Sequence, residues 1–324
     1  MILKQRGARV VIANQWDRFG LPFLLAVLIV VFSGLSESFR TVYNLVSNFQ
    51  FAAMVGIGAI GMAFCIMSGD FDISVGSMSA LVGVLGASLV PRFGGGVGVA
   101  VTVLLATALG FLNGVFVTKL KIPAFITTLG MMYIYRSLAY IYTNNTPVYI
   151  KDPFWLFLGN GAVLGVPFAI ILMAVCYAAG IYLLRKTPFG RYVVAVGTNR
   201  TAARLSGINV DGIKLAVFTM VGLFVGIASV VTAATLGSVN PGMTGQGYEF
   251  QLITAVVLGG TALGGGNGNL LGAFFASMIV VYLKNGLGMK QVNSYWQFVA
   301  FGLVLIFAVG INRIKFTLLG MRET

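Results

Sequence analysis

Long apolar stretches follow one another through almost the whole sequence, and they constrain the fold more than any other feature. Several exceed the roughly 18 residues that a helix needs to cross a hydrocarbon core about 30 Å thick. Apolar residues make up 58% of the chain and charged residues only 9%, whereas a soluble domain carries roughly 25% charged residues. The sequence therefore predicts an all-α integral membrane protein with about ten transmembrane helices, some of them short or broken. We expect the spans near 21–35, 44–67, 73–90, 97–117, 124–142, 164–184, 215–236, 249–264, 269–287 and 295–311.

Basic residues are unevenly distributed between the loops that join these spans. Of the 21 Lys and Arg residues, 15 fall on one side, four on the other and two within spans. Because loops rich in Lys and Arg stay in the cytoplasm, we expect both termini to be cytoplasmic. The net charge of +13 is then a signal of topology, and lipid rather than nucleic acid is the expected surrounding. The predicted organisation is a tail at 1–20, one polytopic membrane domain at 21–311 with a cytoplasmic loop at 185–214, and a tail at 312–324.

The loop at 185–214 is the longest polar segment of the chain. It carries six basic residues against one acid, and the stretch from Thr198 to Ser206 predicts a short helix with a polar start and a glycine after it. Small side chains on a short helix can enter a groove on another protein. We therefore interpret the loop as a docking surface for a soluble partner. The alternative is an ordinary positively charged loop with no partner.

Two glycine-rich interruptions break the apolar pattern, at Ser68–Met78 and at Leu258–Asn269. Irregular backbone at membrane depth is tolerated where protein or a water-filled cavity satisfies its amides. Paired broken segments in the two halves of a chain are typical of a transport pathway. Close packing of helices through small residues is the alternative explanation.

Acidic side chains near these interruptions are the candidate residues of a pathway or gate. They are Asp70, Asp72 and the neighbouring Ser74, together with Glu249 at the start of the eighth span. Charge at membrane depth costs free energy, so an acid there is a functional candidate. Capping of a helix N-terminus is the alternative for Asp72 and Glu249, and Asp70 is less well explained by capping.

Features of the common catalytic and metal sites are missing from the sequence. The chain has no His and only two Cys, both in apolar stretches, so we expect no metal site and no disulfide. The glycine-rich run at 259–268 lacks the Lys–Ser/Thr pair of a phosphate-binding loop. A transporter driven by ATP would need its ATPase on another chain. Two alternatives remain: a secondary transporter that couples a solute to protons and acts alone, and a membrane enzyme that uses the same carboxylates.

Three motifs resemble the permease subunit of bacterial ABC importers for simple sugars: SGDFDISVGSM at 68–78, FGRYVVAVGTNRTAARLSGINV at 189–210, and the segment 249–266. The SGDFD form and WDRFG at 16–20 are most similar to arabinose-type permeases. The resemblance implies an inner-membrane subunit that imports a pentose or hexose and holds no cofactor. Its implied partners are a second permease copy, a periplasmic sugar-binding protein and an ATPase with two nucleotide-binding halves, which would hold ATP and Mg²⁺.

The resemblance also implies roles for particular residues. Residues that match the family's coupling helix, which contacts the ATPase, are Gly197, Asn199, Ala202, Ala203, Gly207 and Ile208. In the first motif, Asp72 matches the family aspartate, whereas Asp70 departs from the usual pattern, which is close to GGIDLSVGS. Whether Asp70 affects the choice of substrate or only the local cap stays open at this point.

Overall fold

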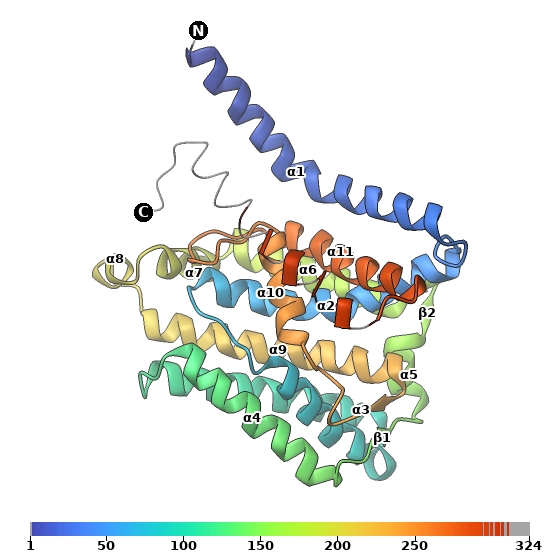
Figure 1. Cartoon of the computed structure of the whole chain (residues 1–324). Coiled ribbons are helices and arrows are strands. Elements are labelled where there is room, and N and C mark those ends of the chain that lie inside the picture. The colour runs from blue at the N-terminus through green and yellow to red at the C-terminus, as the bar shows by residue number, and fades with distance from the viewer. Residues whose placement is uncertain are drawn as a thin grey trace.

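The computed structural model describes residues 2–293, 295–297, 299–300, 302–304, 306–307 and 310, with the backbone alone described for 2–18. In this part of the chain the fold is almost entirely helical, and most helices lie side by side in Figure 1. The helices are α1 (Ile2–Leu35), α2 (Val42–Met67), α3 (Val75–Thr118), α4 (Ala124–Thr143), α5 (Pro153–Asn160), α6 (Phe168–Lys186), α7 (Pro188–Thr198), α8 (Arg200–Leu205), α9 (Val210–Leu236), α10 (Tyr248–Leu258) and α11 (Leu270–Met289).

Helix α2 is the centre of the fold. In its most apolar window of 18 residues, 83% of the residues are buried, against 28% in the corresponding windows of α3 and α6. Helices α6, α9, α10 and α11 pack around it. The apolar residues of α2 therefore meet protein, whereas α1, α3, α4 and α6 expose large apolar side chains at their surfaces. This division is the expected one for a bundle whose outer surface faces lipid.

Helix α3 is two helices joined at a sharp turn. Gly94 has φ 80° and ψ 164°, a backbone conformation that breaks the helix and that a glycine adopts readily. The two halves fold back against each other, since a Cβ on Gly98 would lie 2.8 Å from the carbonyl oxygen of Gly86. The halves correspond to the predicted spans at 73–90 and 97–117.

Glycines allow the second half of α3 to touch α9 directly. A Cβ on Gly110 would overlap the carbonyl oxygen of Phe218 and lie 2.8 Å from the amide nitrogen of Gly222. A Cβ on Gly222 would in turn overlap the carbonyl oxygen of Ala106. Close approach of backbones through small residues is a common packing mode of membrane helices.

Five helices of the described residues are long and apolar enough to cross a membrane: α2, α3, α6, α9 and α11. The predicted spans at 44–67, 124–142, 215–236 and 269–287 agree with α2, α4, α9 and α11 within a few residues. The span expected at 249–264 is shorter than predicted, because α10 ends at Leu258. The span expected at 21–35 lies within α1, whose apolar part is Phe19–Leu35. The span at 295–311 lies partly, and the tail at 312–324 wholly, outside the described residues.

Short elements that the sequence did not predict close the end of the molecule opposite α8 (Figure 1). They are α5 and two small antiparallel pairs. Strand β1 (Val148–Tyr149) pairs with β4 (Ser238–Val239), and β2 (Ala162–Val163) pairs with β3 (Val166–Pro167). The β1–β4 pair joins the segment after α4 to the segment after α9. Both cysteines, Cys65 and Cys176, are free and buried, as predicted.

Candidate functional site

The three sequence motifs meet at one end of α2, next to α7 and α8. The backbone N–H of Gly266 donates to the carbonyl oxygen of Met67 at 2.9 Å. Gly197 packs so closely that a Cβ on it would overlap the same carbonyl oxygen. A Cβ on Gly265 would lie 3.1 Å from both the Gly197 and the Gly69 Cα atoms. Segments that lie more than 60 residues apart in sequence therefore form one junction, here called the glycine junction and made of Met67, Gly69, Gly197, Gly265 and Gly266.

The loop at 259–269 is compact and held by its own polar groups. The N–H of Ala262 donates to the carbonyl oxygen of Asn267, and Asn269 caps α11 by accepting from the N–H of Gly272. Gly260, Gly265 and Gly266 all have positive φ angles, at which an L side chain is strained. The glycines therefore allow the loop at 259–269 to follow a tight path against α7 and α2.

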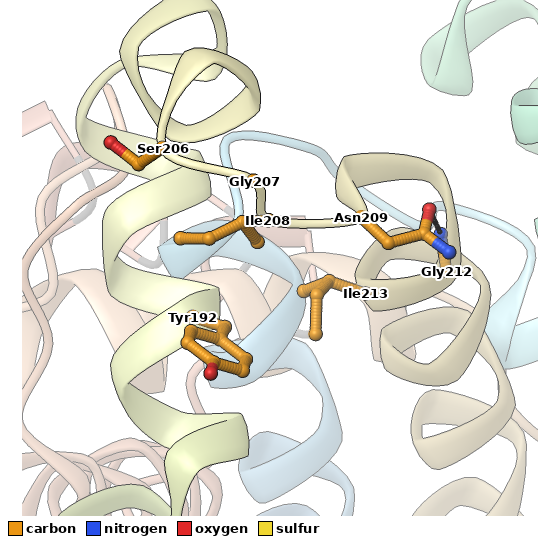
Figure 2. A pocket seen from close by; sticks show the side chains of 7 residues that line it. All are labelled: Tyr192, Ser206, Gly207, Ile208, Asn209, Gly212 and Ile213. Atoms are coloured by element: carbon orange, nitrogen blue, oxygen red, sulfur yellow. Dashed lines mark hydrogen bonds between the residues drawn. The ribbon is translucent and has the colours of Figure 1, made fainter.

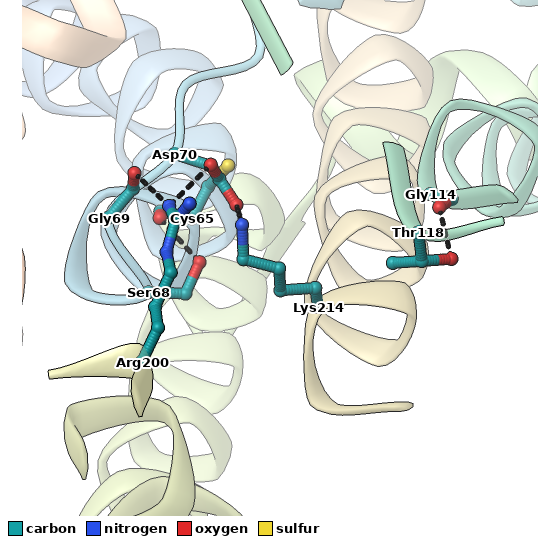
Figure 3. Close-up of polar contacts among 8 residues, drawn as sticks. All are labelled: Cys65, Ser68, Gly69, Asp70, Gly114, Thr118, Arg200 and Lys214. Carbon is teal, nitrogen blue, oxygen red and sulfur yellow. Dashed lines mark hydrogen bonds and ion pairs between the residues drawn. The ribbon is translucent and has the colours of Figure 1, made fainter. Parts of the chain in front are cut away.

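Asp70 is buried, with 7% of its surface exposed, and it lies between two cations (Figure 3). Its Oδ1 is 2.9 Å from the guanidinium of Arg200, and its Oδ2 is 2.6 Å from the Nζ of Lys214. The same guanidinium nitrogen of Arg200 also donates to the carbonyl oxygen of Gly69 at 2.8 Å. Asp70 therefore takes no part in capping α3, and it contacts the beginnings of α8 and α9 instead.

Asp72 is fully buried in the segment that leads into α3, and hydrogen bonds from several residues hold its carboxylate. Its Oδ1 accepts from the N–H of Ser74 at 2.9 Å and from the Ser74 hydroxyl at 2.6 Å. Its Oδ2 accepts from the amide of Asn113 at 3.1 Å, and Tyr135 donates to the Oδ1 of Asn113 at 2.9 Å. The N-cap residue of α3 is Ser74, whose side chain makes no capping hydrogen bond, so the capping alternative for Asp72 at a helix starting near residue 73 is wrong; Asp72 instead accepts from the N–H of the N-cap residue. In this structure Asp72 and Ser74 are both buried, without exposed surface.

The beginnings of α3 and α10 meet beside the middle of α2. The hydroxyl of Tyr248 in α10 donates to the carbonyl oxygen of Met54, and a Cβ on Gly58 would overlap that hydroxyl. Because a helix rises 1.5 Å per residue, Met54 and Gly58 lie roughly 14–20 Å from the Met67 end of α2. A Cβ on Gly76 would overlap the carbonyl oxygen of Gly245, so α3 begins next to the segment that leads into α10. The N-termini of α3 and α10 therefore both lie inside the bundle.

Glu249 lies in the first turn of α10 at this meeting point. It is 9% exposed, and its Oε2 would be 2.7 Å from a Cβ on Gly76. Arg136 of α4 donates to the carbonyl oxygens of Pro241 and Thr244, at 2.6 and 2.8 Å, and so supports the chain that leads into α10. These two carbonyl oxygens are the hydrogen-bond partners of the Arg136 guanidinium in the structure.

Helix α8 confirms the predicted short helix between Thr198 and Ser206. The side chain of Asn199 caps it by accepting from the N–H of Ala202 at 2.9 Å, and Gly207 ends it with φ 81°. Thr201 and Ala202 are exposed. Ala203 is 4% exposed and packs on Val196 and Val210. Of the small residues, Ala203 therefore seats α8 on the molecule, while Ala202 is on its free surface.

A pocket of about 450 Å³ lies beside α8, between α7 and the start of α9 (Figure 2). Gly207 and Ile208, two of the residues matched to the coupling helix, are part of its wall. Ile213 and Tyr192 provide apolar surface opposite them, as Figure 2 shows. The complete lining is Tyr192, Ser206, Gly207, Ile208, Asn209, Gly212 and Ile213.

Several residues of the site were not predicted from the sequence. Asn113 and Tyr135 complete the Asp72 network from α3 and α4. A polar Asn inside an apolar span was the available signal for the first of them, because such residues usually find a buried partner. Lys214 was expected in a polar loop, and its burial against Asp70 carried no signal in the sequence.

The polar contacts of the site link separate segments of the chain. In the part of the chain that the structure describes, they form no arrangement for bond-breaking chemistry. Among the described residues there is no group of three or more His, Cys, Asp or Glu that could hold a metal ion. The carboxylates of Asp70 and Asp72 are occupied by ion pairs and hydrogen bonds within the chain. The arrangement can transmit a displacement from α8 to the beginnings of α3 and α10.

Comparison with known proteins gives a consistent result over nearly the whole chain. The model of the family described as "Branched-chain amino acid transport system / permease component" matches residues 44–309. The ribose import permease protein of Escherichia coli strain K12 is 40% identical over 297 residues, which cover 90% of this chain and 92% of the relative. That of Bacillus subtilis strain 168 is 36% identical over 306 residues, 91% and 92% of the two chains.

The L-arabinose transport system permease protein of Escherichia coli strain K12 is 38% identical over 301 residues, covering 93% of this chain and 92% of the relative. No solved structure matches the chain.

Proposed function

This chain belongs to the family of permease components of branched-chain amino acid transport systems, and we propose that it is the membrane subunit of an ATP-driven importer of a monosaccharide, a pentose or a hexose. It is a transport subunit and not an enzyme. The observation that carries the proposal is its identity of 36–40% with permeases named for ribose and L-arabinose. Both of these sugars are pentoses.

The proposed topology has ten spans, with the termini and the α8 end of the molecule in the cytoplasm of a bacterium and the protein in its inner membrane. The distribution of basic residues supports this orientation. Five of the six basic residues of the 185–214 segment have exposed side chains. The β1–β4 pair and α5 then face the periplasm.

The proposed partners are a second copy of the chain, a periplasmic sugar-binding protein and an ATPase with two nucleotide-binding halves. ATP and Mg²⁺ would be held by the ATPase. The capped helix α8, surrounded by exposed Arg191, Arg200 and Arg204, supports the docking of a soluble, acidic surface at this end. The six residues matched to the coupling helix, Gly197, Asn199, Ala202, Ala203, Gly207 and Ile208, would shape and seat that contact.

Uptake into proteoliposomes tests the proposal. The vesicles contain the chain with its ATPase inside and its binding protein outside, and the probes are radiolabelled ribose, L-arabinose and leucine. We expect one of the sugars, and not leucine, to accumulate only when ATP and Mg²⁺ are present. Uptake by the chain alone, driven by a proton gradient, would instead establish a secondary transporter. Turnover of solute without movement would establish a membrane enzyme.

Exposed Ala202 is the position at which docking of the ATPase can be tested without disturbing the fold. Replacing Ala202 by Arg adds a bulky cation to the free face of α8. We expect nucleotide hydrolysis by the assembled complex to lose its stimulation by loaded binding protein about tenfold or more, the size of a central interface contact. The control is Ala202→Ser, which keeps a small side chain at the same exposed position. Equal stimulation in both variants would contradict docking at α8.

Glu249, Asp72 and Ser74 remain the proposed pathway and gate residues, at the depth where α3 and α10 begin. Replacing Glu249 by Gln keeps its size and removes its charge. We expect sugar uptake to fall about three- to tenfold, the ratio that corresponds to about 0.7–1.4 kcal/mol. Glu37→Gln, at an exposed ion pair with Arg40, serves as the control in the same uptake assay. Unchanged uptake in the Glu249 variant would remove Glu249 from the pathway.

A further inference from the structure

Asp70 joins two parts of the molecule by ion pairs, beside the hydrogen bond that Arg200 donates to the carbonyl oxygen of Gly69. It belongs to the segment 68–74, which links α2 to α3. Arg200 is the first residue of α8, and Lys214 is the fifth residue of α9. These two cations lie on either side of the short link between α8 and α9, and both contact the one carboxylate. The ion pairs therefore hold both ends of that link against the segment that enters α3.

The segment 68–74, which Asp70 holds, leads directly to the start of α3 inside the bundle. Ser74 follows Asp70 by four residues, and α3 begins at Val75. Gly76 then touches Gly245 and Glu249 at the start of α10. A shift of α8 and α9 at the surface is thus passed through Asp70 to the two helix N-termini in the middle of the molecule.

Capping does not explain why an acid lies at position 70. Asp72 already accepts from the N–H of Ser74, the residue that precedes α3. Burial of Asp70 and Lys214, whose side chains are each 8% exposed, costs desolvation free energy that their attraction offsets only with close contact. An isolated carboxylate at this depth would be strongly unfavourable. Asp70 and Lys214 are therefore stable at this buried position only as an ion pair.

A second ion pair at the same end of the molecule has a different position. Lys121, in the link between α3 and α4, lies 2.6 Å from Asp211 in the first turn of α9. The side chains of Lys121 and Asp211 are 61% and 41% exposed, and this ion pair does not involve the segment 68–74. This pair has the same charges and the same helix α9, which makes it a matched control.

We propose that Asp70 is a positioning residue for energy coupling: its ion pairs with Lys214 and Arg200 fix the segment entering α3 to α8 and α9, so that movement imposed on α8 by the ATPase displaces the start of α3. This inference rests on the proposed function. It assigns Asp70 a role away from the substrate, in contrast to the pathway role expected from the sequence.

The test compares two double variants in proteoliposomes that contain the complete importer. Asp70→Asn/Lys214→Met removes both charges of the buried pair, so neither is left unpaired in the interior. Lys121→Met/Asp211→Asn removes both charges of the exposed pair. The measured quantity is the coupling ratio, defined as sugar molecules imported per ATP hydrolysed. A loss of folded protein lowers import and hydrolysis together and leaves this ratio unchanged.

We expect the coupling ratio to fall about fivefold or more in Asp70→Asn/Lys214→Met, the lower end of coupling between linked sites. The control variant keeps the ratio of the unaltered chain. Arg200→Gln, at a side chain that is 50% exposed, removes one of the two ion pairs without leaving a buried charge bare. It provides a second measurement if the double variant does not fold, and we expect a smaller fall in the ratio.

An unchanged coupling ratio in the folded double variant, or in Arg200→Gln if the double variant does not fold, would overturn the role of Asp70. An equal fall in the exposed-pair control would also overturn it, because any loss of charge at this end would then suffice. Failure of the unaltered chain to import sugar with ATP is a separate outcome, which contradicts the proposed function before any variant is compared.

Discussion

Replacing Gly110 by Leu is expected to destabilise the protein more than any other single change considered for this chain. The first added carbon would overlap the carbonyl oxygen of Phe218, and it would lie 2.8 and 2.9 Å from backbone atoms of Gly222. Backbone cannot yield as a flexible side chain can, so α3 and α9 would have to separate. Overpacking of this kind costs about 3 kcal/mol, which lowers the unfolding midpoint by roughly 4–5 °C in a chain of this size.

This prediction is checked by measuring the unfolding midpoint of the purified protein in detergent. The midpoint is followed by size-exclusion chromatography after heating. Gly130→Leu in α4 is the matched control, because a Cβ on Gly130 meets no atom within 4 Å and the residue is exposed. Similar midpoints for the two leucine variants would show that the contact between α3 and α9 is not as close as described.

Replacing Asp72 by Ala is expected to give the second-largest effect. The change leaves the N–H of Ser74 and an amide hydrogen of Asn113 without their acceptor in a fully buried position. Each unsatisfied buried group costs about 1–3 kcal/mol. We expect a loss of about 2 kcal/mol or more and a midpoint lower by roughly 3 °C or more.

The matched control for this second change is Asp211→Ala, also an acid at the beginning of a helix. Its pair with Lys121 is exposed, and exposed pairs contribute about 0–1 kcal/mol. Thermal midpoints of both variants and of the unaltered protein are compared in one detergent. If Asp211→Ala were the more damaging change, the buried network of Asp72 would not be the support of α3 described above.

The sequence predicted the local features of the candidate site better than its long-range contacts. The helix between Thr198 and Ser206 follows from residue types a few positions apart, and it is present. The pairing of Asp70 with Lys214 joins positions 144 residues apart, and no local pattern indicates it. The burial of Ala203 was equally hidden, since a helix of six residues is too short for its apolar face to be read from spacing.

The same distinction holds for the fold. Hydropathy predicted the cores of α2, α4, α9 and α11, because long apolar runs require helices in lipid. Helix α7 was missed, since its amphipathic sequence lies in a polar loop and is stabilised by its packing on α6 and α9. The β1–β4 pair was missed because two-residue strands give no periodic signal. The early end of α10 depends on the loop at 259–269 turning back against α7.

The direct backbone contact between α3 and α9 has a mechanical consequence. No side chains separate the two helices at Gly110 and Gly222, so there is little compliance between them and they move as one rigid arm. Helix α9 has 27 residues, a length of about 40 Å. A tilt of about 5° at its Lys214 end swings the opposite end by roughly 3.5 Å over that length. A small rotation on one side of the membrane is thereby amplified into a displacement comparable to the width of a water molecule on the other.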